Sequence, residues 1–277
     1  MNTAAARTWL AAAGLGLVCA CAPALRKPPP VAVLGNPAGA AAPAASSRAD
    51  VDRLLADAEA AFGRRPDMRE ATTAYSTFLA AARADETRVE GLLGAARTAG
   101  WIIEHEPGEE RRTRLATEAV QACQWCVTRA PASIACRYRL ALALGQQARE
   151  RPSTSKDGLT KMIALLEEVA AEDPTHDNAG PHRVLALVLL RAPGWPAGPG
   201  DPEAALVHAR KANELAPDDA DNLLVLGEAL AKNDDPTQAR LAYARAQAIA
   251  RTRAAAGDPD ASEIVTSADR ALRTLPR

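Results

Sequence analysis

The sequence has few aromatic residues and no hydrophobic run long enough to cross a membrane. Phenylalanine, tryptophan and tyrosine together account for 3% of the 277 residues, and the formal net charge is −1. This near-neutral balance argues against nucleic acid as a partner, because phosphate binding needs a clear excess of basic residues. Valine and isoleucine are scattered instead of alternating with polar residues, so no β-strand is predicted.

Alanine, by contrast, is abundant within a hydrophobic fraction of 48%. Alanine favours helices, and its small side chain lets helices pack closely. Residues 50–277 are enough for one large domain or a repeat array. This composition predicts an all-α body.

A short apolar stretch begins at Trp9 and is about a dozen residues long, against the roughly 20 that a membrane-spanning helix needs. It ends in Val18-Cys19-Ala20-Cys21, which resembles the lipobox of bacterial lipoproteins with Cys21 as the acylated residue. Residues 1–20 are therefore expected to be a lipoprotein signal peptide. The alternative is an ordinary signal peptidase site, with Cys21 incidental.

Residues 21–49 contain the run Pro28-Pro29-Pro30 and a stretch rich in alanine, glycine and serine. No periodic apolar face is visible, and such composition is typical of disordered linkers. We predict a lipidated, disordered tether that holds the body away from a bilayer. The expected location is the periplasm, and Ala22 in place of an aspartate after Cys21 favours the outer membrane by analogy with enteric bacteria.

The clearest repeat unit lies near the C-terminal end. Seven positions match the template of the tetratricopeptide repeat (TPR) in register. They are Leu223, Leu226, Gly227 and Leu230 in a first helix and Ala239, Tyr243 and Ala246 in a second. Pro236 separates the two helices, and Asp234-Asp235 provides a cap for the second.

Other units are marked by an Ala-Pro or Asp-Pro pair that ends a second helix, because proline interrupts a helix. These pairs are Ala130-Pro131, Asp173-Pro174 and Ala216-Pro217. Upstream, helices are expected at 51–62, 68–84, 88–104 and 109–129, and a last helix at about 260–275 caps the stack. We predict that residues 50–277 form a right-handed α-solenoid of TPR-like helical hairpins.

One unit is longer than the others. Pro174 and Pro217 are 43 positions apart, against about 34 residues in a standard repeat. The excess falls at 192–201, which contains three prolines and three glycines and cannot be helical. Trp195 in this turn either packs over the groove between Leu187, Leu190 and Leu206, which is the favoured interpretation, or contacts a partner. In the second case Trp195, Pro196 and Arg183 are the candidate binding residues.

Several segments resemble the T-component lipoproteins associated with TRAP transporters. They are 177–186, Ala192-Pro193-Gly194-Trp195-Pro196 with Gly200-Asp201, 140–145 with Gly158-Leu159, and 94–97 with Trp101. The resemblance covers roughly residues 50–255. It implies a periplasmic accessory protein that contacts a solute-binding protein and offers an apolar channel to a hydrophobic ligand. Arg139 and the three body cysteines depart from the family pattern.

The body cysteines are Cys123, Cys126 and Cys136. Cys126 and Cys136 lie five residues on either side of Pro131, at a turn between two antiparallel helices, so a disulfide is possible in an exported protein. Free buried thiols and a metal or redox site are the alternatives. A zinc site would need a fourth ligand, and a thioredoxin-like motif follows a strand, whereas this one lies within a helix.

No catalytic set is visible. His105 stands between Glu104 and Glu106 and is interpreted as part of a solvated face, and the other histidines lack metal-ligand spacing. We predict a non-enzymatic protein without cofactor or metal, whose work is to bind a protein partner. The first candidate is a TRAP solute-binding protein. The alternatives are an adaptor for envelope assembly and a carrier of a hydrophobic small ligand.

Overall fold

The computed structural model describes residues 22–35 and 47–276, so Cys21 and residues 1–20, predicted to be a signal peptide, lie outside the described residues. The described ranges form eleven α-helices, two short 3-10 helices and no strand. The helices are α1 (Arg48–Gly63), α2 (Met68–Ala84), α3 (Glu90–His105), α4 (Glu109–Arg129), α5 (Ile134–Glu150), α6 (Ser155–Glu172), α7 (His176–Arg191), α8 (Pro202–Leu215), α9 (Ala220–Lys232), α10 (Pro236–Ala255) and α11 (Ala261–Thr274).

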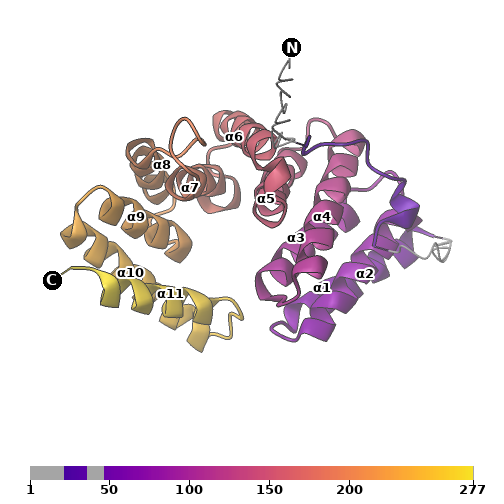
Figure 1. The fold of residues 1–277 in the computed structure, drawn as a ribbon. Helices are drawn as coiled ribbons and strands as arrows, with labels where there is room; N and C mark the ends of the chain where they lie inside the picture. Colours follow the sequence, from indigo (N-terminus) through magenta and orange to yellow (C-terminus); the bar gives the residue numbers. More distant parts are fainter. Residues whose placement is uncertain (1–21, 36–46, 277) are drawn as a thin grey trace, which may run out of the picture.

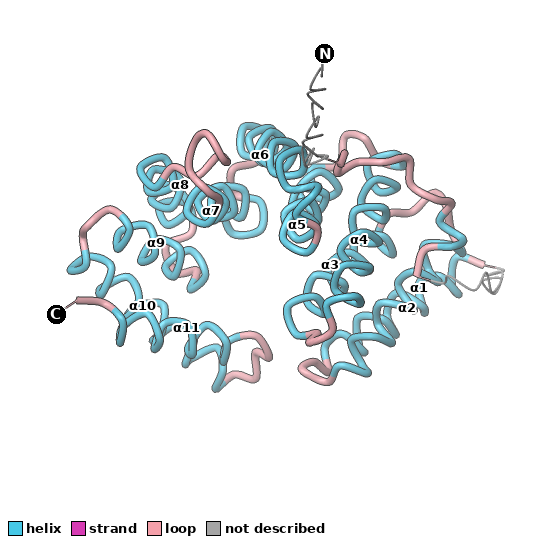
Figure 2. The backbone as a smooth tube through the Cα atoms, viewed as in Figure 1, coloured by secondary structure: helices cyan, strands magenta, loops and turns pink. Residues whose placement is uncertain are grey.

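Each helix packs against the next, and each odd-numbered helix also packs against the next odd-numbered one. Figure 1 shows the result as a curved double layer, with the odd-numbered helices toward the centre of the arc and the even-numbered ones outside. Figure 2 shows that the connections are short loops, apart from the extended segment near the N-terminus and the turn between α7 and α8. The predicted all-α solenoid of helical hairpins is confirmed.

The helix boundaries follow from local chemistry. Asp201, Asp219 and Asp235 each accept a backbone hydrogen bond from the first turn of the helix that follows. These bonds satisfy amides that have no partner inside the helix. Pro202 and Pro236 occupy first-turn positions, where no amide hydrogen is needed.

Close helix contacts explain two of the glycines. A Cβ atom at Gly227 in α9 would lie 2.6 Å from the ring of Tyr243 in α10. A Cβ atom at Gly94 in α3 would lie 2.4 Å from the ring of Phe78 in α2. In both pairs an aromatic ring fills the space that the missing side chain leaves, which is the packing expected from the repeat template.

The two ends of the solenoid touch. Arg65, in the loop between α1 and α2, donates to both carboxylate oxygens of Asp260 at 2.9 and 2.5 Å. Nε2 of His105 at the end of α3 lies 2.6 Å from Oε1 of Glu263 in α11. Figure 1 shows these ends approaching at the bottom of the view. The double layer is therefore curved enough for its first hairpins to meet its last helix.

Residues 22–35, predicted to be part of a disordered tether, instead pack on the body, and we call them the strap. The side chains of Ala24, Val31 and Leu34 are buried. The strap contains the 3-10 helix η1 (Val31–Val33). Backbone carbonyl groups along the strap accept hydrogen bonds from side chains of the body. The prediction is wrong for this segment because an extended chain can bury single side chains and satisfy its backbone without any periodic apolar face.

Candidate functional site

The turn between α7 and α8 is held by its own backbone. The amide of Gly200 donates to the Pro193 carbonyl at 2.8 Å, and the amide of Ala197 donates to the Gly194 carbonyl at 3.0 Å. The amide of Asp201 donates to the Leu189 carbonyl at 2.9 Å, which ties the end of the turn to α7. We call residues 192–201 the Trp195 turn.

Two glycines are required because the backbone of this turn passes very close to its own carbonyl oxygens. A Cβ atom at Gly200 would lie 2.3 Å from the Ala192 carbonyl oxygen, and one at Gly198 would lie 2.6 Å from the Pro193 carbonyl oxygen. Real side chains do not approach backbone oxygen this closely. The glycines therefore allow a compact turn, which is braced by its own backbone hydrogen bonds and by one bond to α7.

Trp195, within this turn, is 89% exposed. The favoured prediction, that the indole covers the groove between α7 and α8, is wrong. Leu187, Leu190 and Leu206 already pack around Ala186 and Ala209, together with side chains of α9. Since alanines bring these helices close together, the groove is filled without an indole.

Pro196 is also exposed, and the peptide bond that joins it to Trp195 is cis. An exposed indole on a braced turn is well suited to binding, because little conformational entropy is lost when a partner covers it. Other large exposed apolar side chains of the described residues, Val33, Val207 and Leu241, are aliphatic and lie elsewhere in the chain.

Arg183 has a structural role that the sequence did not indicate. Its side chain is only 15% exposed. The guanidinium donates to Oδ2 of Asp177 at 3.1 Å, to Oδ1 of Asn222 at 3.0 Å and to the carbonyl groups of Asp177 and Asn178. Its donors are thus committed inside the protein, and we remove Arg183 from the candidate binding residues.

This network holds an irregular start of α7. Asp177, Asn178 and Ala179 have φ values of 51°, 55° and 63°, a region that non-glycine residues rarely adopt. Oδ2 of Asp177 accepts from the Tyr138 hydroxyl at 2.8 Å, and Asn222 donates to the Asn178 carbonyl at 2.9 Å. The sequence signal for this feature was the segment 177–186, which we interpreted only through its family resemblance.

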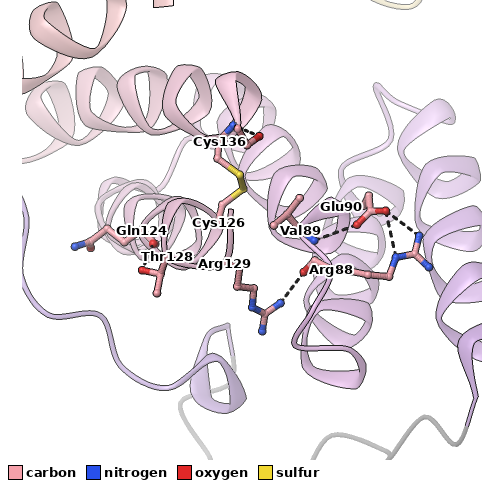
Figure 3. The surroundings of a disulfide bond; sticks show 9 residues. Arg88, Val89, Glu90, Gln124, Cys126, Thr128, Arg129 and Cys136 are labelled. Carbon is pink, nitrogen blue, oxygen red and sulfur yellow. Dashed lines mark hydrogen bonds and ion pairs between the residues drawn. A yellow bond between two sulfur atoms is a disulfide. The ribbon is translucent and has the colours of Figure 1, made fainter. Parts of the chain in front are cut away.

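The structure contains a disulfide between Cys126 in α4 and Cys136 in α5, with the two Cα atoms 5.4 Å apart. Figure 3 shows the bond near the end of α4, where Arg129 also donates to the Arg88 carbonyl at 2.8 Å. Cys123 is a buried free thiol, and burial raises its pKa to about 12. A thiol that stays protonated is a poor nucleophile and metal ligand.

The histidines make contacts that the sequence spacing did not reveal. The Nδ1 atoms of His182 and His208 are 3.1 Å apart, so one ring donates to the other. Burial lowers the pKa of both residues, and the neighbouring His208 lowers that of His182 further. Within 22–35 and 47–276 no group of three or more histidine, cysteine or acidic side chains is arranged to hold a metal ion.

His105 was interpreted as part of a solvated face, but its ring stacks on Trp101 with centroids 3.9 Å apart. Its Nδ1 atom lies 2.7 Å from the Trp101 carbonyl oxygen, and Nε2 faces Glu263. Only a doubly protonated ring can donate to both acceptors. Burial lowers the pKa of His105, but the Trp101 carbonyl and the Glu263 carboxylate outweigh it, and the pKa is raised.

The surface hollows of the described residues are shallow and differ in lining. One of about 530 Å³ between α9 and α11 is lined partly by Ala231, Tyr243, Leu275 and Pro276. Another of about 800 Å³ runs along the outer helix α4 and is open to solvent. Its lining consists of charged and hydroxyl or amide side chains, which are Glu109, Glu110, Thr113, Arg114, Thr117, Glu118 and Gln121. It offers no enclosed apolar surface to a hydrophobic ligand. In the part of the chain that the structure covers, no helix is both long and apolar enough to cross a membrane.

Stacked antiparallel hairpins with glycine–aromatic contacts define this molecule as a TPR-like α-solenoid. In agreement, it resembles the crystal structure of TTC0263, a thermophilic TPR protein of Thermus thermophilus. The TM-score is 0.60 at 17% sequence identity, over 80% of this chain and 99% of that one. MamA gives a TM-score of 0.45 at 16% identity, over 74% of this chain and 93% of that one. No protein-family model and no curated protein matches the sequence.

Proposed function

We propose that this protein is an exported lipoprotein, acylated at Cys21, that uses the Trp195 turn to bind a protein partner. The observation that carries the binding role is the 89% exposure of Trp195 on a turn braced by its own hydrogen bonds. The TPR-like fold supports a role in protein interaction, because stacked hairpins present an extended rigid surface. In this proposal the protein works by binding and catalyses no reaction.

The proposed partner is a periplasmic solute-binding protein of a TRAP-type transporter. The support is the resemblance of 177–186 and of the Trp195 turn to T-component lipoproteins. An adaptor role in envelope assembly would use the same scaffold and is the alternative partner class. The hollow along α4 is open to solvent and lined by charged, hydroxyl and amide side chains, so it gives no support to the third possibility, a carrier of a hydrophobic ligand.

Photo-crosslinking from the turn tests this proposal. A photoreactive phenylalanine derivative replaces Pro196 in the full-length protein, which is expressed in the native envelope. The control carries the same group in place of Leu241, an exposed residue on α10. Mass spectrometry should identify a TRAP solute-binding protein among products from position 196 and not from position 241. Crosslinks to outer-membrane assembly components would favour the alternative, and no specific product at position 196 would contradict a binding role for the turn.

The lipid anchor needs a separate experiment, because Cys21 lies outside the described residues. Cys21→Ser should accumulate as an unprocessed precursor without acyl chains, whereas Cys19→Ser should be acylated like the unmodified protein. Intact mass spectrometry of membrane fractions measures both outcomes. Identical processing of Cys21→Ser and the unmodified protein would rule out Cys21 as the acylated residue.

A further inference from the structure

The start of the strap is fixed to the corner between α5 and α6. The amide of Ala22 donates to the carbonyl of Ser153, in the 3-10 helix η2 (Pro152–Thr154), at 2.8 Å. The amide of Ala24 donates to Oδ2 of Asp157 at 2.7 Å, and the Ala24 side chain is only 4% exposed. Hydrogen bonds from two backbone amides, together with one buried side chain, therefore hold the first three residues of the strap.

The rest of the strap is held as well. Gln124 donates to the Arg26 carbonyl at 2.9 Å, and the Trp125 indole donates to the Pro29 carbonyl at 2.7 Å. Arg83 donates to the Leu34 carbonyl, and Leu34 is 2% exposed. Figure 1 shows the strap leaving the region of α5 and α6 and passing α4 to reach α2. Hence no slack chain separates Ala22 from the body, and position 21 is one residue, or about 3.8 Å of backbone, away.

The same corner carries exposed positive charge. Arg26 and Lys27 of the strap and Lys156 in the first turn of α6 are all exposed. Arg26 and Arg151 line one small hollow together with Pro23 and Ala24. The nearby carboxylate of Asp157 is already paired with Lys161 and with the Ala24 amide. The surface beside the start of the strap is therefore basic, and anionic lipid headgroups attract such clusters of lysine and arginine.

We propose that this corner, residues 22–27 with 152–156, is the membrane-facing surface of the anchored protein. This inference rests on the proposed acylation of Cys21. An acyl chain one residue before Ala22 brings the corner to the bilayer, and Arg26, Lys27 and Lys156 contact anionic phospholipid headgroups. The strap then fixes the orientation of the whole solenoid relative to the bilayer, and it does not act as a flexible spacer.

Fluorescence quenching by nitroxide-labelled lipid tests the orientation. Full-length Ser153→Cys is purified in its acylated form, labelled with a fluorophore and reconstituted in vesicles of phosphatidylethanolamine and phosphatidylglycerol. The matched control is Gly63→Cys at the last residue of α1, where an added Cβ meets no atom within 4 Å. Labelling is selective because Cys123 is buried and Cys126 is bonded to Cys136.

The expected result is quenching at Ser153→Cys at least threefold stronger than at Gly63→Cys. Equal quenching of the two labels in protein whose mass shows acylation would overturn the orientation and leave the anchor intact. A mass without acyl chains would overturn the anchor and, with it, this inference. The two failures are therefore distinguishable.

The headgroup contact is tested by replacing Arg26, Lys27 and Lys156 with glutamine in the acylated, labelled protein. Quenching at position 153 should increase with the phosphatidylglycerol content for the parent and respond much less in the triple variant. The control replaces three exposed cations elsewhere, Arg53, Arg210 and Arg245. The same phosphatidylglycerol response in both variants would contradict a role for the strap cations.

Discussion

The two halves of the solenoid are packed differently. From the strap to α7, one continuous core contains large buried side chains such as Phe78, Ile102, Tyr138 and Leu166. From α7 to α11, three small clusters take its place, and alanines such as Ala209, Ala229 and Ala239 fill most of their centres. The first half also contains the disulfide, whereas the second contains the irregular start of α7 and the exposed Trp195.

This difference shows how one fold can combine a continuous core with an exposed turn. Large buried side chains belong to one continuous cluster that joins the hairpins from α1 to α7. Each alanine-rich cluster of the second half spans only a few adjacent helices, so an extra turn between α7 and α8 leaves the other clusters undisturbed. We infer that the second half accommodates the Trp195 turn because its packing is local.

The largest expected effect is in the continuous core. Phe78→Ala should lower the free energy of unfolding by about 3–5 kcal/mol, because it leaves a cavity under Gly94 that the helices cannot close. Tyr243→Ala, the counterpart beside Gly227, should cost less, since its cluster is small. Chemical denaturation followed by circular dichroism measures both, and Leu241→Ala should change the free energy by no more than about 0.5 kcal/mol. An equal loss of unfolding free energy in Tyr243→Ala and Phe78→Ala would contradict the difference in packing between the two halves.

The disulfide should contribute the next largest effect, also in the first half. Cys126→Ser with Cys136→Ser should lower the free energy of unfolding by about 2–3 kcal/mol, because the bond closes a loop of 10 residues in the unfolded chain. Non-reducing intact mass should show the protein two hydrogen masses lighter than its reduced form. Alkylation of three body cysteines without reductant would show that the bond does not form.

The contact between the two ends should have the smallest effect and should depend on pH. The pKa of His105 is raised in the folded protein, so its stabilisation is fully present below the unfolded value of about 6.5 and is lost as the pH rises through the folded value. The pair is partly exposed, so we expect less than about 1 kcal/mol.

Comparing the free energy of unfolding of Glu263→Gln and the unmodified protein between about pH 5 and 8 isolates this contribution. The difference should be largest at the acidic end and shrink as the pH rises. Glu214→Gln is the control, because it removes an exposed ion pair whose other member, Lys211, is not a histidine. A difference that grows with pH would contradict the assignment of the charged form of His105 to this contact.

The sequence was sufficient for the repeats but not for contacts between distant segments. Asp-Pro and Ala-Pro pairs, capping aspartates and the match at Gly227 and Tyr243 are local signals, and they located the helices. The strap was missed because three single buried side chains leave no periodic pattern. The direction of Trp195 was missed because prolines and glycines indicate a turn without indicating which side of it faces solvent.

Long-range pairs such as Arg65 with Asp260 join residues 195 positions apart. Such pairs depend on the accumulated curvature of the successive helix connections, which no local pattern encodes. The same limit applies to His182 and His208, since their 26-residue separation spans the extra turn. The sequence is therefore informative about each hairpin and silent about how far the stack curves.

The central claim is that Trp195 serves binding and not folding. The most direct measurement compares Trp195→Ala with the unmodified protein in two assays, the free energy of unfolding and the affinity for the partner identified by crosslinking. We predict a change in unfolding free energy of no more than about 0.5 kcal/mol, together with a loss of about 2 kcal/mol in binding, or roughly 30-fold in affinity. A folded variant that binds the partner as tightly as the unmodified protein would contradict the claim.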